Sequence, residues 1–161
     1  MIQQVREKDI DACVQVIQES FGTVADALGF TPQNAPRFTA FATTADRLKW
    51  HMYGEHRPMY AWCEDEKIIG YYSLLVLEHK ECELNNLCVL PSCRHKGIGK
   101  RLIHHCFDIA RTLGCEKLKI GIVEENKILR KWYESLGFLH TGTKKSAAFP
   151  FTIGSMEKNL K

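Results

Sequence analysis

The feature that most constrains this chain is a short basic segment with two glycines, placed between a predicted strand and a predicted helix. The segment from Glu81 to Leu90 indicates a strand that Pro91 ends, and a helical spacing of apolar residues begins at Ile98. The first turn of a helix offers backbone N–H groups without partners and the positive end of the helix dipole. Glycines at 97 and 99 let a phosphate approach that backbone closely, so we expect this turn to hold a diphosphate.

Two other phosphate-binding patterns fit the turn less well. A dinucleotide fingerprint would have a third glycine where Leu102 stands, within repeated strand–helix–strand units. A P-loop would follow Lys100 with serine or threonine, whereas Arg101 follows it here. Taken alone, the turn is also compatible with a basic helix start that binds nothing.

The whole chain, residues 1–161, indicates a single domain with about seven strands and about four helices. The predicted strands cover Ile2–Val5, Met59–Glu64, Ile68–Leu77, Glu81–Leu90, Lys117–Val123 and two segments after Phe138; one predicted helix follows Lys8, and three more cover Thr44–Tyr53, Ile98–Leu113 and Lys127–Leu136. The segment from Gly29 to Pro36 is predicted to be a loop or a broken helix. This order indicates a mixed α/β or α+β fold with one twisted, mostly antiparallel sheet.

Composition argues against several classes of protein. A formal net charge of +3, with acids interleaved among the bases, is too small to indicate nucleic-acid binding. The seven cysteines form an odd set without CxxC spacing, which is unlike a secreted disulfide framework. No apolar run reaches the length of a membrane span. We therefore expect a reduced, cytoplasmic protein without nucleic-acid or membrane partners.

Cysteine and histidine side chains near the glycine turn raise the alternative of a zinc site. Strand alternation predicts that Cys82 and Cys88 share a face only with each other. His104 and His105 would point about 100° apart on a helix. No pair of ligand doublets results, so we expect no metal.

The glycine turn and a second segment together resemble the GNAT superfamily of N-acetyltransferases. Arg94–Gly99 matches its Q/R-x-x-G-x-G/A signature, and Leu87–Pro91 resembles the strand that precedes it. Asn126, followed by Trp132–Phe138, is similar to the second motif of the family, an asparagine and then Y-x-x-x-G-F. The resemblance is good over roughly Ile68–Phe138, and loose or absent before it.

This resemblance implies acetyl-CoA as the co-substrate. It implies that backbone amides from Arg94 to Lys100 hold the pyrophosphate, and that Leu87 and Val89 pair with the pantetheine through their backbones. The sheet is then expected to splay between the strand of Leu87 and that of Ile120, and Asn126 is expected to bond the pantetheine or its surroundings. The expected cofactor-binding residues are Leu87, Cys88, Val89, Arg94, His95, Lys96, Gly97, Ile98, Gly99, Lys100 and Asn126.

Acetyl transfer to an amine requires a base, a polarised carbonyl and an acid. Glu83 is the predicted base, because it shares the strand alternation of Leu87 and Val89 and because many GNAT enzymes have a glutamate at this place. A surface glutamate is the alternative. The resemblance implies a polarising backbone amide on the same strand, often at a bulge, for which Leu87 is the candidate. Tyr133 is the candidate acid, with a packed core aromatic as its alternative.

The acceptor is expected to be a small-molecule or peptide amine that binds in the poorly matched part of the chain. One wall of that site would draw on Phe38, Phe41, Trp50, Tyr53 and Trp62, and the other on the terminal segment Lys144–Met156, with Phe149–Phe151. For most of the first set, packing between two amphipathic helices is the alternative. A non-catalytic acyl-CoA-binding or sensing domain of the same fold is the alternative function. Many proteins of this superfamily pair through exposed strands, so a homodimer is compatible with the sequence.

Overall fold

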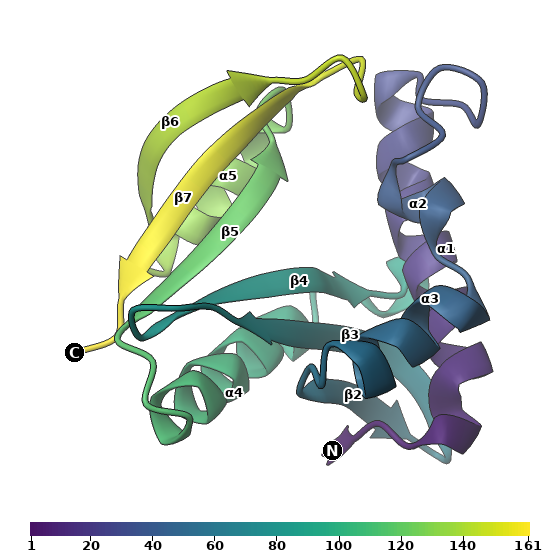
Figure 1. The fold of residues 1–161 in the computed structure, drawn as a ribbon. Helices are drawn as coiled ribbons and strands as arrows, with labels where there is room; N and C mark the ends of the chain where they lie inside the picture. The colour runs from purple at the N-terminus through teal and green to yellow at the C-terminus, as the bar shows by residue number, and fades with distance from the viewer.

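The computed structural model describes residues 1–161 and is built on one seven-stranded sheet (Figure 1). The strands are β1 (Ile2–Gln4), β2 (Met59–Glu64), β3 (Lys67–Val76), β4 (Glu81–Val89), β5 (Lys117–Val123), β6 (Leu139–Lys145) and β7 (Thr152–Asn159). Their order in the sheet is β1-β2-β3-β4-β5-β7-β6, and only β4 and β5 are parallel. The prediction of a seven-stranded, mostly antiparallel sheet is confirmed.

Five α-helices accompany the sheet, where about four were predicted. They are α1 (Ile10–Leu28), α2 (Thr39–Ala42), α3 (Ala45–Lys49), α4 (Ile98–Thr112) and α5 (Lys127–Ser135), with shorter helical turns η1 (Glu7–Asp9), η2 (Trp50–Gly54) and η3 (Pro91–Cys93). The additional helix, α2, has only four residues, too few to show a periodic pattern in the sequence. The helix predicted over Thr44–Tyr53 is divided into α3 and η2. None of these helices is both long and apolar enough to cross a membrane.

The helices lie on the two faces of the sheet. α1 packs against β3 and β4 on one face, and α4 packs against the same strands on the other (Figure 1). α1 forms because Ile10, Cys13 and Ile17 recur at helical spacing and are buried against the sheet. It ends at Gly29, whose left-handed backbone (φ 73°) lets its N–H bond to the carbonyl of Ala25.

The two parallel strands separate along most of their length. β4 and β5 pair only through Glu81–Glu83 and Lys117–Lys119, although both strands continue for several more residues. Beyond Glu83, β4 therefore pairs only with β3, and its other edge keeps free backbone groups. This separation, which we call the splay, was expected from the family resemblance and is confirmed.

A β-bulge interrupts β4 just where the splay begins. Ser73 pairs with Asn85, but Tyr71 pairs with Cys88, so β4 has one more residue than β3 over this interval. Asn86 takes the left-handed conformation (φ 58°) that the extra residue requires.

The bulge reverses the alternation of side chains along β4, and this overturns two predictions. Glu83 does not share a face with Leu87 and Val89. Cys82 does not share a face with Cys88 either. The Cys82 thiol lies near Cys106 of α4, whereas the Cys88 thiol lies against Ser20 of α1.

Candidate functional site

The turn between β4 and α4 presents a row of unpaired backbone donors. The six consecutive N–H groups from His95 to Lys100 donate to no protein acceptor, and the helical ladder begins only at Arg101, which donates to the carbonyl of Gly97. We call this stretch of backbone the phosphate cradle. Free N–H groups at the positive end of a helix favour an anion with several oxygens, so the cradle fits a pyrophosphate.

Two residues of the phosphate cradle have the left-handed backbone conformation, which is unfavourable for residues that carry a side chain. Gly97, at the N-cap of α4, has φ 81°, and His95 has φ 63°. Gly99 is helical, and a Cβ there would come no closer than 3.7 Å to Trp132 and 3.8 Å to Val89. The left-handed conformation therefore requires glycine at 97, whereas at 99 there is room for a methyl group.

The Arg94 side chain binds protein groups. Its Nε donates to the carbonyl oxygen of Val89 at 3.2 Å, and its two terminal nitrogens donate to Thr23 Oγ1 at 3.1 Å and to the carbonyl oxygen of Ser20 at 3.0 Å. Arg94 therefore ties the end of β4 and the start of the cradle to α1. Nothing in the sequence pattern pointed to Ser20 or Thr23 as its partners.

Trp132 of α5 lies beside the start of α4. Its indole carbons come within 3.7 Å of the position that a Cβ on Gly99 would take, and Val89 approaches the same point to 3.8 Å. Leu87 is half-buried against the main core. Val89 and Trp132 thus lie together beside the phosphate cradle, at the end of the free edge of β4. In the sequence, Trp132 stood out only as a member of the second family motif.

Asn126 caps α5. Its Oδ1 accepts a hydrogen bond from the backbone N–H of Leu129 at 3.2 Å, while its Nδ2 has no protein partner. The capping explains in structural terms why asparagine suits this position. The amide nitrogen is left to serve another acceptor.

Glu83 lies at the base of the splay, opposite Lys119 in the parallel pair. Its carboxylate forms neither a hydrogen bond nor an ion pair. Lys119 pairs instead with Glu81, at 2.7 Å between Nζ and Oε2. Lys117 also contacts Glu81, at 3.8 Å, and Glu157, at 3.7 Å. In this group of charges Glu83 is the carboxylate that forms no ion pair, although Lys119 is close enough to act on it electrostatically.

Tyr133 is buried between α5, α4 and β4, and it packs on Trp132 and Phe138 with ring centroids 5.0 and 5.2 Å away. Burial raises the pKa of its phenol, and the nearby thiols of Cys106 and Cys88 add to the shift. The hydroxyl bonds no protein group. The Tyr133 ring therefore packs in the core, as the alternative expectation for this residue stated. Its hydroxyl group nevertheless has no protein partner and stays available.

Some of the aromatic residues expected at the acceptor site do come together. Phe38, Phe41, Phe149 and Phe151 belong to one cluster of rings. Trp50 and Tyr53 lie on η2 outside that cluster and are 62% and 56% exposed. Trp62 is on β2, where its indole donates to Glu64 and its ring faces Arg101. Phe30, which the sequence did not indicate, meets Phe38 edge to face at 5.1 Å between ring centroids and lies 5.0 Å from Phe151.

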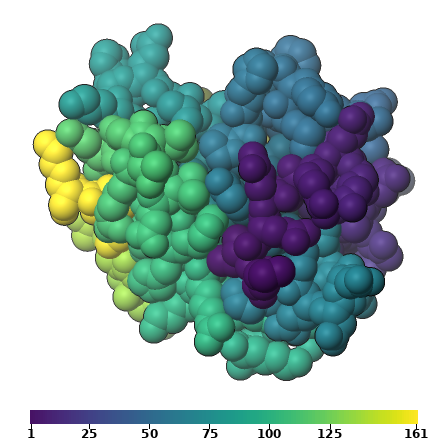
Figure 2. All heavy atoms as spheres, turned by 90° about the horizontal axis from the view of Figure 1, so that it is seen from below, coloured from purple at the N-terminus to yellow at the C-terminus, as the bar shows by residue number.

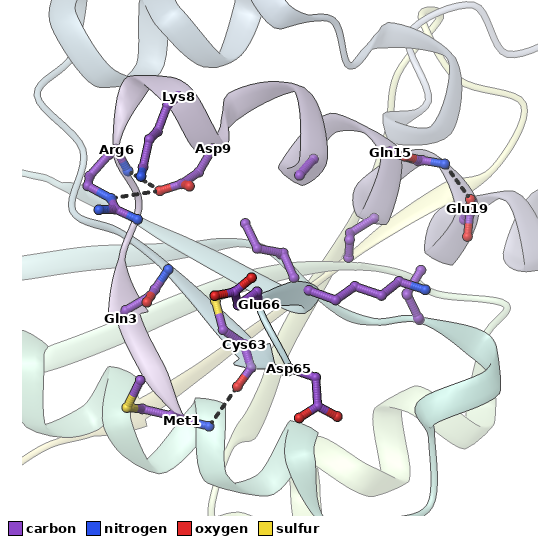
Figure 3. Close-up of a pocket in the computed structure, with 15 residues that line it drawn as sticks. Met1, Gln3, Arg6, Lys8, Asp9, Gln15, Glu19, Cys63, Asp65 and Glu66 are labelled. Carbon is purple, nitrogen blue, oxygen red and sulfur yellow. Dashed lines mark hydrogen bonds and ion pairs between the residues drawn. The ribbon is translucent and has the colours of Figure 1, made fainter.

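A cavity of about 750 Å³ elsewhere in the molecule does not include any of these groups. It lies between the start of α1, β1 and the β2–β3 turn, where charged residues such as Arg6, Asp9 and Glu66 surround it (Figure 3). The N-terminal segment and α4 occupy the face opposite the β6–β7 turn (Figure 2). No group of three or more histidine, cysteine, aspartate or glutamate side chains is arranged to hold a metal ion.

The family model described as "Acetyltransferase (GNAT) family" matches residues 26–138, which is well over half of the chain. This chain belongs to that family. It is therefore an acetyl-CoA-dependent N-acetyltransferase, which confirms the resemblance seen in the two motifs.

Relatives of known sequence agree with this acetyltransferase over different lengths. It is 22% identical to an N-acetyltransferase of Mycobacterium bovis, over 94% of this chain and 93% of that protein. It is 39% identical to an N-acetyltransferase of Bacillus methanolicus over 62 residues, which are 38% of this chain and 52% of the Bacillus protein.

Solved structures share the fold of the acetyltransferase. PaiA N-acetyltransferase from Thermoplasma acidophilum, in complex with coenzyme A, has a TM-score of 0.82 at 18% identity and covers 99% of this chain and 98% of its own. The ribosomal-protein-S18-alanine N-acetyltransferase of Escherichia coli has a TM-score of 0.78 at 18% identity, covering 100% and 94%. At these identities the likeness concerns the fold alone.

Proposed function

We propose that this acetyltransferase moves an acetyl group to a primary amine by direct attack, with Glu83 as base, Tyr133 as acid and the Leu87 amide polarising the carbonyl. Acetyl-CoA supplies the acetyl thioester. The observation that carries the proposal is the unpaired Glu83 carboxylate at the base of the splay, beside a β-bulge in β4.

The phosphate cradle supports the binding half of this proposal. Its six free N–H groups, with Lys96 and Lys100 close by, suit the pyrophosphate of acetyl-CoA. The free edge of β4 beyond Glu83, including Leu87, Cys88 and Val89, offers backbone groups for the pantetheine amides, and on this edge only the Val89 carbonyl already accepts a hydrogen bond, from Arg94. The Asn126 Nδ2 is a further donor at the end of β5.

Glu83 can accept the proton of the attacking ammonium because its carboxylate forms no ion pair. A primary amine has a pKa of about 10, so most of it is protonated at neutral pH and has to lose a proton before attack. Bulges re-aim backbone groups as well as side chains. A backbone N–H at the bulge, for which we choose Leu87, would face the developing negative charge on the carbonyl oxygen.

Tyr133 can return a proton to the leaving thiolate. Burial raises the pKa of this tyrosine and so holds its proton, which by itself makes the transfer harder. Burial disfavours a charged thiolate as well as a charged phenolate, so a leaving thiolate in the same low-dielectric surroundings would also gain basicity. The two effects oppose each other, and the transfer remains feasible.

The base is tested with Glu83→Gln, assayed by thiol release at saturating acetyl-CoA. We expect kcat to fall about 10²-fold or more with a strongly basic amine, the usual size of a general-base contribution. The defect should shrink with an acceptor of low pKa, since most of that amine is already neutral. Glu78→Gln, in the exposed turn before the same strand, is the control, because it leaves the Glu81–Lys119 pair intact. Equal activity of Glu83→Gln and the wild type would exclude the role.

The acid is tested with Tyr133→Phe, which keeps the ring packing and removes only the hydroxyl. We expect a lower kcat with little change in acetyl-CoA binding, and Tyr60→Phe, in a tyrosine that stacks on Tyr72, is the control. An unchanged kcat would remove the role. Stabilisation of the wild type by acetyl-CoA, without thiol release over a panel of amines, would indicate the alternative of an acyl-CoA-sensing domain.

A further inference from the structure

A wall of phenylalanine rings connects the β6–β7 turn to the segment that follows α1. Phe151 lies with its ring centroid 5.0 Å from that of Phe30 and 5.9 Å from that of Phe38. Phe149 extends the contact, at 4.9 Å from Phe151. Figure 1 shows the β6–β7 turn reaching toward the C-terminal end of α1. We call these four residues and Phe41 the phenylalanine wall.

The wall and Glu83 belong to the same face of the sheet. Glu83 stands opposite Lys119, and strand alternation places Lys119, Gly121 and Val123 on one face of β5. Val123 packs into the same small apolar cluster as Phe38 and Phe151. The four residue steps from Lys119 to Val123 cover about 13 Å at ~3.3 Å per step, a length that one small amine can bridge with help from the side chains at each end.

At the end of this face near the phenylalanine wall the charges disfavour an acceptor with several positive groups, whereas Glu81 and Glu157 accompany Glu83 at the other end. Lys144 lies opposite Ile153, which in turn lies opposite Val123, so Lys144 shares the face of the wall. Its ammonium is exposed and forms no ion pair. Arg37, next to Phe38, is likewise exposed and unpaired. Two free cations near the rings would repel a second ammonium group on the acceptor.

We propose that the acceptor is a primary monoamine with an aromatic or branched apolar body, which rests on the half-buried rings of Phe30 and Phe151 while its amine lies at Glu83. Phe38, which is only 4% exposed, supports these two rings from the core. The inference rests on the proposed function and adds the class of substrate. Aromatic rings bind apolar groups over a large area and favour edge-to-face contacts with another ring. An arylalkyl monoamine meets both requirements.

The experiment measures thiol release with 2-phenylethylamine and with 1,4-diaminobutane at saturating acetyl-CoA. We expect kcat/KM for 2-phenylethylamine to be at least about tenfold higher, since an apolar pocket distinguishes ligands by factors of this order. Phe151→Ala should reduce kcat/KM for 2-phenylethylamine about tenfold, mainly through KM, and change that for 1,4-diaminobutane less than about twofold.

Phe151→Leu keeps an apolar group, so it should give an intermediate loss and covers the case in which the alanine variant folds poorly. Thermal unfolding with and without CoA verifies that each variant is folded. Trp50→Ala removes an exposed aromatic outside the wall and should change neither amine.

Three outcomes decide the inference. A selective loss for 2-phenylethylamine in the Phe151 variants supports it. Preference of the wild type for 1,4-diaminobutane, or an equal loss for both amines, overturns it and leaves the proposed function standing. Absence of thiol release with every amine overturns the proposed function and this inference together.

Discussion

Gly97 and Gly99 lie two residues apart in the phosphate cradle but meet different constraints. Gly97 needs its left-handed backbone to turn the chain into α4, and nothing lies within 4 Å of the place where a Cβ would be. The obstacle to a side chain at 97 is therefore conformational strain and not crowding. At Gly99 the backbone is helical, and a Cβ would make ordinary contacts with Trp132 and Val89.

Replacing each of these two glycines by alanine should have a different effect. Gly97→Ala should lower the free energy of unfolding by about 1–2 kcal/mol, the cost of a left-handed alanine, and raise KM for acetyl-CoA because the cradle amides are displaced. Gly99→Ala should leave stability unchanged or raise it by up to about 1 kcal/mol, because alanine favours a helix. Urea unfolding and steady-state kinetics measure both effects. A Gly97→Ala variant as stable as Gly99→Ala would contradict the strain argument.

Arg94 supports a second prediction at this scale. If its guanidinium positions the cradle, Arg94→Lys should behave like Arg94→Gln, because neither side chain can reach the three acceptors that the arginine fork reaches. Both variants should raise KM for acetyl-CoA more than they lower kcat. Thr23→Val, which removes one acceptor, should show a smaller effect of the same kind. A normal Arg94→Lys beside an impaired Arg94→Gln would show that the charge matters and the geometry does not.

Among the elements, β4 carries the feature that organises the site. Its first three residues pair with β5, and its bulge reverses which face of the sheet the following side chains occupy. Its last residues have an edge that pairs with no strand. Before the bulge, Glu83 faces the side of α1, while its neighbour Cys82 faces α4. After the bulge the odd-numbered residues Leu87 and Val89 face the side of α4 and α5. Asn86, the residue at the bulge, thus separates the proposed base from the part of the strand that is proposed to bind the cofactor.

Substitutions of Asn86 test the importance of the bulge. Glycine adopts φ 58° without strain, so Asn86→Gly should change the free energy of unfolding by only a few tenths of a kcal/mol. Asn86→Val should destabilise the fold by about 1–2 kcal/mol or more and lower kcat, since β-branched residues strongly disfavour this backbone. Urea unfolding and thiol-release assays provide the comparison. Full activity of Asn86→Val would mean that the bulge geometry is dispensable.

At the scale of the whole molecule, the two halves of the sheet share the main core beneath α4 and are connected again at both ends of the splay. The short pairing between β4 and β5 joins them at one end, and the phenylalanine wall joins the β6–β7 turn to the α1–α2 side at the other. The remaining interval is where the free edge of β4 and the phosphate cradle lie. The arrangement leaves room for a cofactor between halves that remain attached.

The stability of the whole fold should depend on pH through His51, which is only 6% exposed. Burial, with a smaller contribution from Arg57, lowers the pKa of this histidine from 6.5 to about 4. Between these values the unfolded chain binds more protons than the folded one, so the free energy of unfolding falls as the pH decreases from about 6.5 to about 4. The loss should reach roughly 3 kcal/mol at ~1.4 kcal/mol per pKa unit.

Urea unfolding at pH 7 and at about pH 4.5 checks this dependence. In His51→Gln, which does not titrate in this range, the loss between the two values should be clearly smaller than in the wild type. The same slope in both proteins would assign the acid sensitivity to other groups.

Local patterns in the sequence predicted much of this molecule. The strand from Met59 to Glu64, the helix that begins at Ile98 and the strand from Lys117 to Val123 have the expected bounds or nearly so. Such elements depend on spacings of two, three or four residues, which the sequence displays directly. The glycine turn was found for the same reason, because its conformational demand belongs to the residues themselves.

What the tertiary structure decided involves residues far apart in the chain. The bulge in β4 appears only through its register with β3, and it reverses faces that strict alternation had assigned. The partners of Arg94 lie more than 70 residues away on α1, and the phenylalanine wall joins rings from both halves of the chain. By itself the sequence determined the elements, the family and the glycine cradle. Only the fold decided which side chains meet, because contacts between distant segments arise from packing and strand register and leave no periodic trace in the sequence.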